Sequence, residues 1–477
     1  MFIDPRVKTA LRIPDGEANT VLVFNEANFS MLGADFYKLT RGEKRVVVHR
    51  HLKSLARDEQ QSVRAYLSSK GIGHQSFWIA NVITVDHLTS TILKGLLRCC
   101  RHDLKSIVLS RGLNQVTPRL DKSSNSREAK KLNSGVQWNV EHVRADKCWS
   151  KGINGSGVVV ATLDGGVRYT HDALVHTYRG NNNDGTFSHD YNWNDWAYKN
   201  PSPLDDDGHG TNVMGIAVGS KKSGVGVAPG ATWISGKIFN YAGYSATAWT
   251  LGGAQWAMCP SPVNKPGLDE NCTLGADVVS CSWGENDATE PYLKSTVRAW
   301  LKSGMVPVFA VGNSGPQCST SVSPSDYQGV IGVGASDRND NILGYSSRGP
   351  AKINGTKPGP LPYTALAPAI VAPGFDIQGP SYKSDEGYIG MSGTSQSAPH
   401  VAGAAALLLS AYPKLMPTEI LHALFAGASR STLQDPDTGS DNCGGVAWNK
   451  FPNYIYGWGR LDCFASLQIV NTLHHSA

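Results

Sequence analysis

Between residues 20 and 112, some hydrophobic runs are typical of strands and other hydrophobic positions have helical spacing. This combination predicts a small domain that mixes strands and helices. Runs rich in β-branched and aromatic residues predict strands over Thr20–Phe24, Gln75–Val85 and Lys105–Ser110. Helical spacing predicts a helix over Ala56–Lys70, and a second helix with apolar positions at Leu88, Ile92, Leu93, Leu96 and Leu97. Two helices among as many as four strands suit an α+β domain of the split βαβ type.

From residue 136 onward the pattern changes to short apolar runs between glycine-rich turns. The clearest runs are Val158–Leu163, Ala276–Ser280, Val306–Val311 and Val330–Gly334. Apolar runs without polar alternation are typical of strands that are buried on both faces, and hence of a parallel sheet between helices. This region is therefore predicted to be an α/β domain with a doubly wound, mainly parallel sheet. Functional groups of such domains gather at the carboxyl ends of the strands.

The patterns divide the chain into four segments. Residues 1–19 are predicted as an N-terminal extension, 20–112 as the small domain, 113–135 as an exposed polar linker and 136–477 as the α/β domain. The longest apolar block, Val401–Leu409, is about half as long as the roughly 18–20 residues that a membrane helix needs. The sequence therefore excludes a membrane-spanning protein.

The net charge of +5 hides an asymmetry between the two ends of the chain. Residues 1–135 hold 22 Lys and Arg against 12 Asp and Glu, whereas the remainder holds 22 against 27. A basic part joined to an acidic part indicates either two units that attract each other or an arm that binds nucleic acid. The second alternative requires Lys/Arg runs or a known nucleic-acid-binding motif, and neither is visible. We therefore expect no nucleic-acid partner.

The nine cysteines include no CxxC pair, which argues against a zinc ribbon or a thioredoxin-like site. Cys259 and Cys272 flank a loop rich in Pro and Gly, and a disulfide is expected between them. The other five cysteines after residue 135 cannot be paired from the sequence. Cys99 and Cys100 lie in a predicted helix and are expected to be half-buried thiols.

Four sequons of the type Asn-x-Ser/Thr begin at Asn28, Asn154, Asn271 and Asn354, and each permits glycosylation of a surface asparagine. Together with the cysteines they favour a secreted, disulfide-bonded glycoprotein. Residues 1–19 contain no apolar core like that of a signal peptide, and this observation conflicts with the expectation of secretion.

Three reactive residues lie where the predicted sheet gathers its functional groups. Asp164 directly follows the first of the apolar runs, and His209 and Ser395 each lie at the start of a predicted helix. A serine hydroxyl becomes nucleophilic when a histidine takes its proton, and the histidine needs a carboxylate that holds its tautomer. Asn313 follows another strand, and its amide can donate a hydrogen bond to an oxyanion. The alternative role for Asn313 is an Asx-type turn.

The motifs around these residues resemble those of the subtilases, the subtilisin-like serine endopeptidases. The matching motifs, in the family's order Asp, His, Ser, are Asp164-Gly-Gly-Val167, His209-Gly-Thr-Asn-Val213 and Gly393-Thr-Ser-Gln-Ser397. Lesser matches follow the same order as in the family: Gly226–Gly230, Ser282–Gly284, Gly312–Gly315, Tyr345–Pro350 and Val371–Gly374. The similarity spans about residues 136–465 and is greatest to the bacillopeptidase F group of the family.

The resemblance implies a subtilisin-like fold and a catalytic triad of Asp164, His209 and Ser395, with Asn313 in the oxyanion hole. It implies that the strand Ser282, Trp283 and Gly284 pairs with a polypeptide substrate, although an ordinary strand end is the alternative. Residues 20–112 resemble the subtilase propeptide, an intramolecular chaperone and inhibitor that the enzyme removes by self-cleavage. The chemistry requires no cofactor. Structural calcium is common in the family, but no ligand set can be assigned in this sequence.

Three positions depart from the motifs of the family. Gly165 replaces the usual Ser or Thr after the aspartate, Asn212 replaces the second histidine of the His motif, and Gln396 replaces the methionine beside the nucleophile. None of them belongs to the triad, so the resemblance predicts a serine endopeptidase made as a zymogen. The alternatives are a subtilase-like binding protein of low catalytic activity, which the three departures favour, and a processing protease that prefers dibasic sites.

Overall fold

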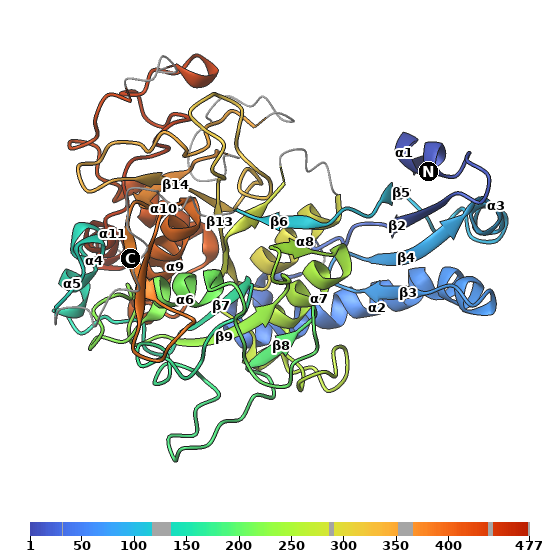
Figure 1. The fold of residues 1–477 in the computed structure, drawn as a ribbon, viewed down its shortest axis with the longest axis horizontal. Helices are drawn as coiled ribbons and strands as arrows, with labels where there is room; N and C mark the ends of the chain where they lie inside the picture. Colours follow the sequence, from blue (N-terminus) through green and yellow to red (C-terminus); the bar gives the residue numbers. More distant parts are fainter. Residues whose placement is uncertain (31, 117–134, 286–290, 352–365, 437–441, 476–477) are drawn as a thin grey trace.

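The computed structural model describes residues 1–30, 32–116, 135–285, 291–351, 366–436 and 442–475. Figure 1 shows a large α/β domain with a smaller N-terminal domain at its side, and strand β6 leading from the small domain into the large one. Most of the predicted linker 113–135 and the sequon at Asn354 lie outside the described residues.

The small domain is a five-stranded sheet with helices packed against it. Its strands are β1 (Phe2–Ile3), β2 (Glu17–Val23), β3 (His74–Phe77), β4 (Val82–Thr89) and β5 (Ser106–Leu109), in the order β1-β5-β2-β4-β3. Its helices are α1 (Pro5–Ala10), the 3-10 helix η1 (Ala34–Lys38), α2 (Arg41–Ser69) and α3 (Ser90–Cys99). Leu22 of β2 packs with apolar residues of these α-helices, whereas its neighbour Val21 joins a cluster shared with the large domain. The sheet therefore has one face toward its own helices and one toward the large domain.

The structure extends this domain beyond the predicted boundary at residue 20. Phe2 and Ile3 pair with β5, and Val7 of α1 lies in the same apolar cluster as Leu22. Residues 1–19 thus belong to the sheet and core of the small domain rather than forming an extension. The predicted strand Gln75–Val85 is in fact the antiparallel pair β3 and β4, because the chain turns between them.

Helix α2 begins at Arg41, well before the predicted start at Ala56. Thr40 caps the helix, because its hydroxyl accepts a hydrogen bond from the Glu43 N–H while the Glu43 carboxylate accepts one from the Thr40 N–H at 2.8 Å. The first half of α2 is rich in charged residues and contains three consecutive valines, so its apolar stripe of Val48, Leu52 and Ala56 is less evident from the sequence. Some of these charged residues, such as Arg45, are buried against the large domain.

The large domain is built on a seven-stranded parallel sheet. Its strands are β7 (Val159–Asp164), β8 (Trp193–Asp195), β9 (Thr232–Lys237), β11 (Val278–Cys281), β13 (Val306–Ala310), β14 (Ile331–Ser336) and β15 (Ile370–Pro373). They lie in the order β15-β14-β13-β11-β7-β9-β8, and every neighbouring pair is parallel. The four apolar runs correspond to β7, β11, β13 and β14, which confirms the predicted α/β fold class.

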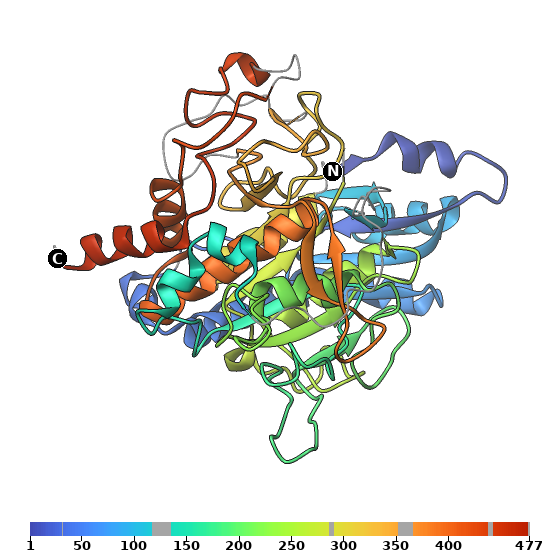
Figure 2. The same cartoon turned by 60° about the vertical axis from the view of Figure 1, so that its left-hand side comes forward.

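Helices cover both faces of this sheet, as adjacent residues of β11 show. Val278 packs in a cluster with helices of one face, and Val279 packs in a second cluster with helices of the other. The first face carries α4 (Trp138–His142), α5 (Ala145–Trp149), α6 (His209–Val218), α9 (Thr394–Ala411), α10 (Pro417–Ala426) and α11 (Cys463–His475). The second carries α7 (Thr247–Met258) and α8 (Pro291–Lys302), and the small domain packs there. Figure 2 shows α9, in orange, along the middle of the domain.

Two small sheets complete the large domain. One is the antiparallel hairpin of β16 (Ile377–Pro380) and β17 (Tyr388–Met391). The other places β6 (Leu113–Gln115) between β10 (Tyr244–Ser245) and β12 (Trp283–Gly284), antiparallel to both. The start of the predicted linker is therefore a strand held by the large domain. The large domain also contains two short 3-10 helices, at Cys272–Leu274 and Cys443–Gly445.

The described residues contain three disulfides. Cys259 is joined to Cys272, and Cys318 is joined to Cys443, which lies 125 positions later in the sequence. Cys99 and Cys100, expected to be thiols, are joined to each other. Among the described helices, none has the length and apolar character needed to cross a membrane.

Candidate active site

Asp164 and His209 meet at the carboxyl edge of the parallel sheet. Asp164 ends β7, His209 begins α6, and both side chains are buried. The Asp164 Oδ1 atom lies 2.7 Å from His209 Nδ1 and also accepts a 2.7 Å hydrogen bond from the Gly165 N–H. The pair therefore has the geometry in which a carboxylate holds the tautomer and orientation of an imidazole.

The loop before His209 is held by two carboxylates that sequence reasoning did not single out. Asp205 accepts hydrogen bonds of 2.8 Å from the N–H groups of Gly208 and Thr211, and Asp207 accepts one of 2.8 Å from the His209 N–H. These bonds satisfy free N–H groups in the first turn of α6 and so fix the position of His209. The sequence signal for this role is a run of aspartates directly before a helix. Burial, and then the Asp207 carboxylate, raise the pKa of Asp205 to about 7.

The electrostatic surroundings of His209 favour its charged form. Burial by itself lowers the pKa of His209, but the carboxylates of Asp164, Asp207 and Asp205 together outweigh burial, and the net effect raises this pKa to about 9. Its Nε2 atom is buried and has no hydrogen-bond partner within the described part of the chain. With Nδ1 held by Asp164, Nε2 is the nitrogen available for proton transfer.

Ser395 lies in the first turn of α9, which packs against α6. Its hydroxyl donates a 2.6 Å hydrogen bond to the carbonyl oxygen of Val116. Its own carbonyl accepts a 3.1 Å hydrogen bond from the Ser282 hydroxyl. Pro399 explains the second contact, because proline has no N–H and the carbonyl four residues earlier therefore lacks its usual helical partner. Ser282, predicted to bind substrate, thus also supports the turn that carries Ser395.

Asn313 lies just after β13, beside the first turn of α9. Its Oδ1 atom accepts hydrogen bonds of 2.9 Å from both the N–H and the hydroxyl of Thr394, the residue before Ser395. These two bonds fix the plane of the side-chain amide, whose NH₂ group is the kind of donor that an oxyanion hole uses.

The chain's own segment 113–116 pairs with the predicted substrate strand. The Val116 N–H donates to the Ser282 carbonyl at 3.0 Å, and the Gln115 N–H donates to the Gly243 carbonyl at 3.0 Å. The side chains of Leu113 and Val116 are buried, with 2% and 7% of their surface exposed. Strand β6 therefore lies as an extended peptide between β10 and β12, and the carbonyl of the next residue, Val116, lies at Ser395.

Two of the three departures from the family motifs contact each other. The Gln396 side-chain amide donates to Asn212 Oδ1 at 3.3 Å, and the Asn212 amide donates to the Ile389 carbonyl at 3.2 Å. Both side chains are fully buried, so each needs such a partner. The side chains of Asn212 and Gln396 therefore bond to each other. Neither side chain takes part in the hydrogen bonds of His209 and Ser395 described above.

Buried charges hold the small domain on the large one. The Asp277 carboxylate binds Arg41 at 2.8 Å and Arg45 at 3.1 Å. Arg45 also donates to the carbonyls of Cys272 and Ala276, at 2.9 and 3.0 Å. The basic residues belong to α2 and the acidic residue to the large domain, which is the polarity that the charge asymmetry of the chain predicts.

Glu270 is a second acidic anchor for the small domain. Its carboxylate binds His49 at 2.9 Å, Lys53 at 2.7 Å and the indole N–H of Trp78 at 3.0 Å. Burial raises the pKa of Glu270, but the bonds from His49 and Lys53 outweigh it and lower this pKa to about 2. Glu270 is thus ionised at neutral pH, where it attracts the basic face of α2.

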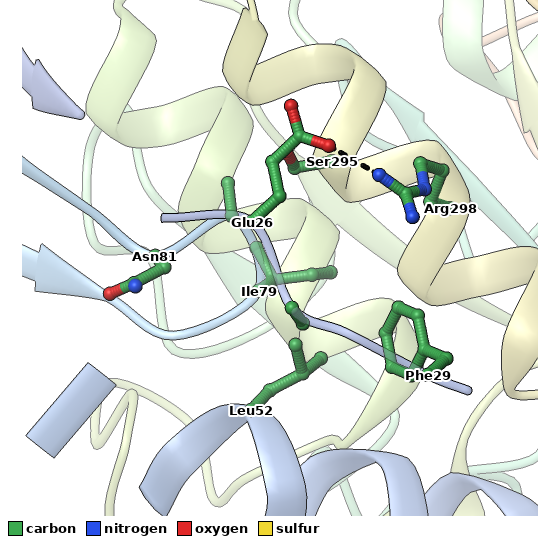
Figure 3. A pocket seen from close by; sticks show the side chains of 9 residues that line it. Glu26, Phe29, Leu52, Ile79, Asn81, Ser295 and Arg298 are labelled. Carbon is green, nitrogen blue, oxygen red and sulfur yellow. Dashed lines mark hydrogen bonds and ion pairs between the residues drawn. The ribbon is translucent and has the colours of Figure 1, made fainter. Parts of the chain in front are cut away.

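A third contact between the domains is visible at a small cleft. Figure 3 shows Glu26 of the small domain paired with Arg298 of α8 at the edge of the cleft, and apolar side chains such as Phe29, Leu52 and Ile79 along its wall. The cleft is the seam between the two domains.

A metal site is not supported by the clearest candidate group. Within the described residues, the side-chain ligand atoms close enough to hold a metal ion are those of His49, Cys259 and Cys272. Both sulfur atoms belong to the disulfide, and His49 is bonded to Glu270. Structural calcium remains an expectation without an assigned ligand set.

Comparison with known proteins places this site in a family. The model of the subtilase family matches residues 155–459, which include Asp164, His209, Asn313 and Ser395. The chain belongs to the subtilase family. Bacillopeptidase F of Bacillus subtilis (strain 168) is 31% identical to this subtilase over 456 residues, which cover 90% of the chain and 29% of that protein. This subtilase therefore spans less than a third of the length of Bacillopeptidase F.

Two further proteins and one solved structure are similar to this subtilase. Serine protease AprX of Bacillus subtilis (strain 168) is 30% identical over 368 residues, which cover 73% of the chain and 75% of that protein. Subtilisin DY of Bacillus licheniformis is 31% identical over 298 residues, which cover 62% of the chain and 92% of that protein. The crystal structure of fervidolysin from Fervidobacterium pennivorans, a keratinolytic enzyme related to subtilisin, matches with a TM-score of 0.62 at 20% identity. That match covers 95% of this subtilase and 61% of fervidolysin, and it shows the subtilisin-like fold.

Proposed function

We propose that this subtilase is a serine endopeptidase made as a zymogen, in which the small domain is the inhibitory propeptide. The observation that carries the proposal is the 2.6 Å hydrogen bond between Ser395 Oγ and the Val116 carbonyl oxygen. This hydrogen bond places the Val116 carbonyl group beside the hydroxyl that would attack its carbon. The activity named for Serine protease AprX supports the same reaction.

In the proposed reaction, Ser395 Oγ attacks the Val116 carbonyl carbon while His209 Nε2 takes the hydroxyl proton. Asp164 holds His209 Nδ1 and stabilises the imidazolium. The Asn313 amide and the Ser395 backbone N–H hold the oxyanion, and one such donor contributes about 3–4 kcal/mol to the transition state. His209 then gives the proton to the leaving amine, the C–N bond breaks, and water hydrolyses the acyl-enzyme through the same base.

The same geometry defines the proposed maturation and the substrates. Self-cleavage breaks the bond between Val116 and Thr117, which lies within the predicted processing segment 113–135, and leaves Val116 as the C-terminus of the propeptide. The cleaved strand remains paired with β10 and β12 and inhibits as a bound product. Because this pairing requires an extended main chain, we propose unfolded or flexible polypeptides as substrates.

The proposed location of the protein is outside the cell. Disulfides persist in oxidising compartments, and the described residues contain three of them. The sequon residues Asn28 and Asn271 are exposed, as glycan attachment requires.

A fluorophosphonate probe, which reacts with activated serines, tests the proposal. The protein is expected to be labelled at Ser395 after incubation and then dilution, which allow self-cleavage and release of the propeptide. Labelling should be much slower before these steps, because the Val116 carbonyl occupies the hydroxyl. The variant Ser395→Ala should not be labelled. A folded wild type that stays unlabelled after incubation and dilution would instead support the alternative of a subtilase-like binding protein with low catalytic activity.

The rate of self-cleavage is expected to rise with pH toward about 9. His209 must be neutral to act as a base, and its pKa is raised from 6.5 to about 9 in the propeptide-bound form. Below this pKa the neutral fraction grows about tenfold with each pH unit, and the rate constant should follow. A time course of fragment formation at several pH values, starting from chain purified in acid, measures the profile. Asp207→Asn should move the profile to lower pH, since the Asp207 carboxylate helps to raise the pKa. A midpoint near 6.5 in the wild type would contradict the prediction.

A further inference from the structure

The side chain of Gln115 lies directly at the catalytic aspartate. Its Nε2 atom donates a 3.0 Å hydrogen bond to Asp164 Oδ1, the oxygen that also binds His209. Gln115 is the residue before Val116, so it is the second residue on the amino side of the proposed cleavage site. Any polypeptide that replaces β6 in the same register places its own side chain here.

The space for this side chain exists because residue 165 is glycine. A Cβ atom at residue 165 would lie 3.1 Å from Gln115 Nε2, and 2.9 and 3.2 Å from the two carboxylate oxygens of Asp207. The amide nitrogen and the Asp207 carboxylate therefore flank the place that a serine or threonine side chain would take. At the other end of the amide, a Cβ at residue 243 would lie 3.1 Å from Gln115 Oε1. We call the site formed by Asp164, Gly165, Asp207 and Gly243 the amide pocket.

The charges around the amide pocket discriminate between side chains of the same shape. The end of the pocket that receives the nitrogen of Gln115 is formed by two carboxylates, and an N–H donor satisfies one of them. Glutamate has the shape of glutamine but brings a third negative charge without a donor, so the carboxylates repel it. The nearby Lys237 does not offset this charge, because its ammonium group is already bonded to Asp206 at 2.7 Å.

We propose that the amide pocket is a specificity site that selects a glutamine-like hydrogen-bond donor, and rejects a carboxylate, at the second position before the cleaved bond. The proposal rests on the proposed peptidase activity and names the class of polypeptide that this activity prefers. Under this proposal, the missing side chain at residue 165 contributes to substrate choice, because it leaves space for the glutamine side chain. The backbone of Gly165 does not have a positive φ angle, so the requirement is for space and not for glycine's conformational freedom.

Peptide cleavage by the self-processed enzyme, after dilution has released the propeptide, gives the first test. Two peptides with the sequence Leu-Asn-Gln-Val or Leu-Asn-Glu-Val before the cleaved bond differ only at the position of interest. Because hydrogen bonds to charged groups and unpaired buried carboxylates each have large effects, kcat/KM should be about 10- to 100-fold higher for the glutamine peptide. Gly165→Ser fills the pocket and should reduce that ratio toward one. Gly344→Ser is the matched control, because a Cβ at the exposed residue 344 contacts nothing within 4 Å, and it should keep the wild-type ratio.

A second test does not depend on catalysis. In full-length Ser395→Ala, the Gln115 and Val116 amides are bonded to Gly243 and Ser282, and hydrogen exchange reports how firmly β6 is held. Adding Gln115→Glu should speed exchange of these amides about tenfold or more, since the hydrogen bond to Asp164 is replaced by repulsion. Adding Gly165→Ser should have a similar effect, and adding Gly344→Ser should have none.

The two tests separate the inference from the proposed function. Equal cleavage of both peptides, together with unchanged exchange in Gln115→Glu, would overturn the amide pocket while leaving the peptidase activity intact. If no peptide is cleaved and Ser395 is not labelled, the proposed function fails, and the exchange measurement alone decides whether the pocket selects an amide.

Discussion

Incubated wild-type chain is expected to separate into two fragments at the bond between Val116 and Thr117, whereas Ser395→Ala stays intact at 51.1 kDa. Val116 directly follows strand β6, which lies between β10 and β12, and its carbonyl contacts the Ser395 hydroxyl at 2.6 Å. Removing the nucleophile of such a triad lowers the rate by about a million-fold, because the histidine and aspartate act only through it. Intact-mass analysis of both proteins after incubation, with sequencing of the new N-terminus, measures the result.

Ser397→Ala is the matched control for this experiment. Ser397 is a buried serine in the same helix, and its hydroxyl makes only a long, 3.5 Å contact with the Gly393 carbonyl within the described residues. Its loss should leave self-cleavage close to the wild-type rate. If Ser395→Ala and the wild type are cleaved alike, another protease matures the chain. A new N-terminus at any residue other than Thr117 would show that Val116 is not the cleavage site.

Arg45→Ala is expected to release the propeptide from the cleaved complex at least about 100-fold faster than the wild type, because breaking a buried ion pair costs several kcal/mol. Arg45 is buried between α2 and the large domain, where it binds Asp277 and two carbonyl groups. Removal of its side chain takes away the donor that Arg45 supplies to the Ala276 carbonyl and leaves part of the Asp277 charge unpaired. Dilution of the cleaved complex, followed by the rise of peptidase activity, measures the release rate.

Arg57→Ala provides the control in the same helix. The Arg57 side chain is 72% exposed and pairs with its neighbour Asp58, so its loss removes a surface interaction of about 0–1 kcal/mol. Release of the propeptide should then be close to that of the wild type. Arg45→Gln retains most of the side-chain length and should fall between the two. Equal release by Arg45→Ala and Arg57→Ala would show that the buried ion pairs with Asp277 do not control inhibition.

Much of the fold could be predicted because its signals are local. The strands of a parallel sheet are buried on both faces, so β7, β11, β13 and β14 appear in the sequence as uninterrupted apolar runs. Helix α2 was predicted only in part, since the charged residues of its first half, some of which contact the large domain, make the apolar pattern there less evident. Local patterning reports burial within one element and does not report which other element covers it.

In the candidate site, too, residues with a local sequence signal could be predicted, whereas contacts between elements could not. Asp164, His209 and Ser395 could be located because each directly follows a strand or begins a helix within a recognisable motif. The roles of Asp205 and Asp207 were missed, because a run of aspartates has many possible structures until the helix it caps is known. The hydrogen bond between Gln396 and Asn212 also could not be predicted, since the two residues lie on different helices.

The sequence by itself determined the family, the α/β fold class and the positions of the three candidate catalytic residues, because all of these are written in short segments of neighbouring residues. Only the tertiary structure decided that β6 lies between β10 and β12, that the Val116 carbonyl contacts Ser395, and that the Gln115 amide reaches Asp164. Only the tertiary structure paired Cys318 with Cys443. The physical reason is distance along the chain. These contacts join residues that are far apart in the sequence, and local hydrophobic periodicity does not report such contacts. The contacts form only when the domains pack.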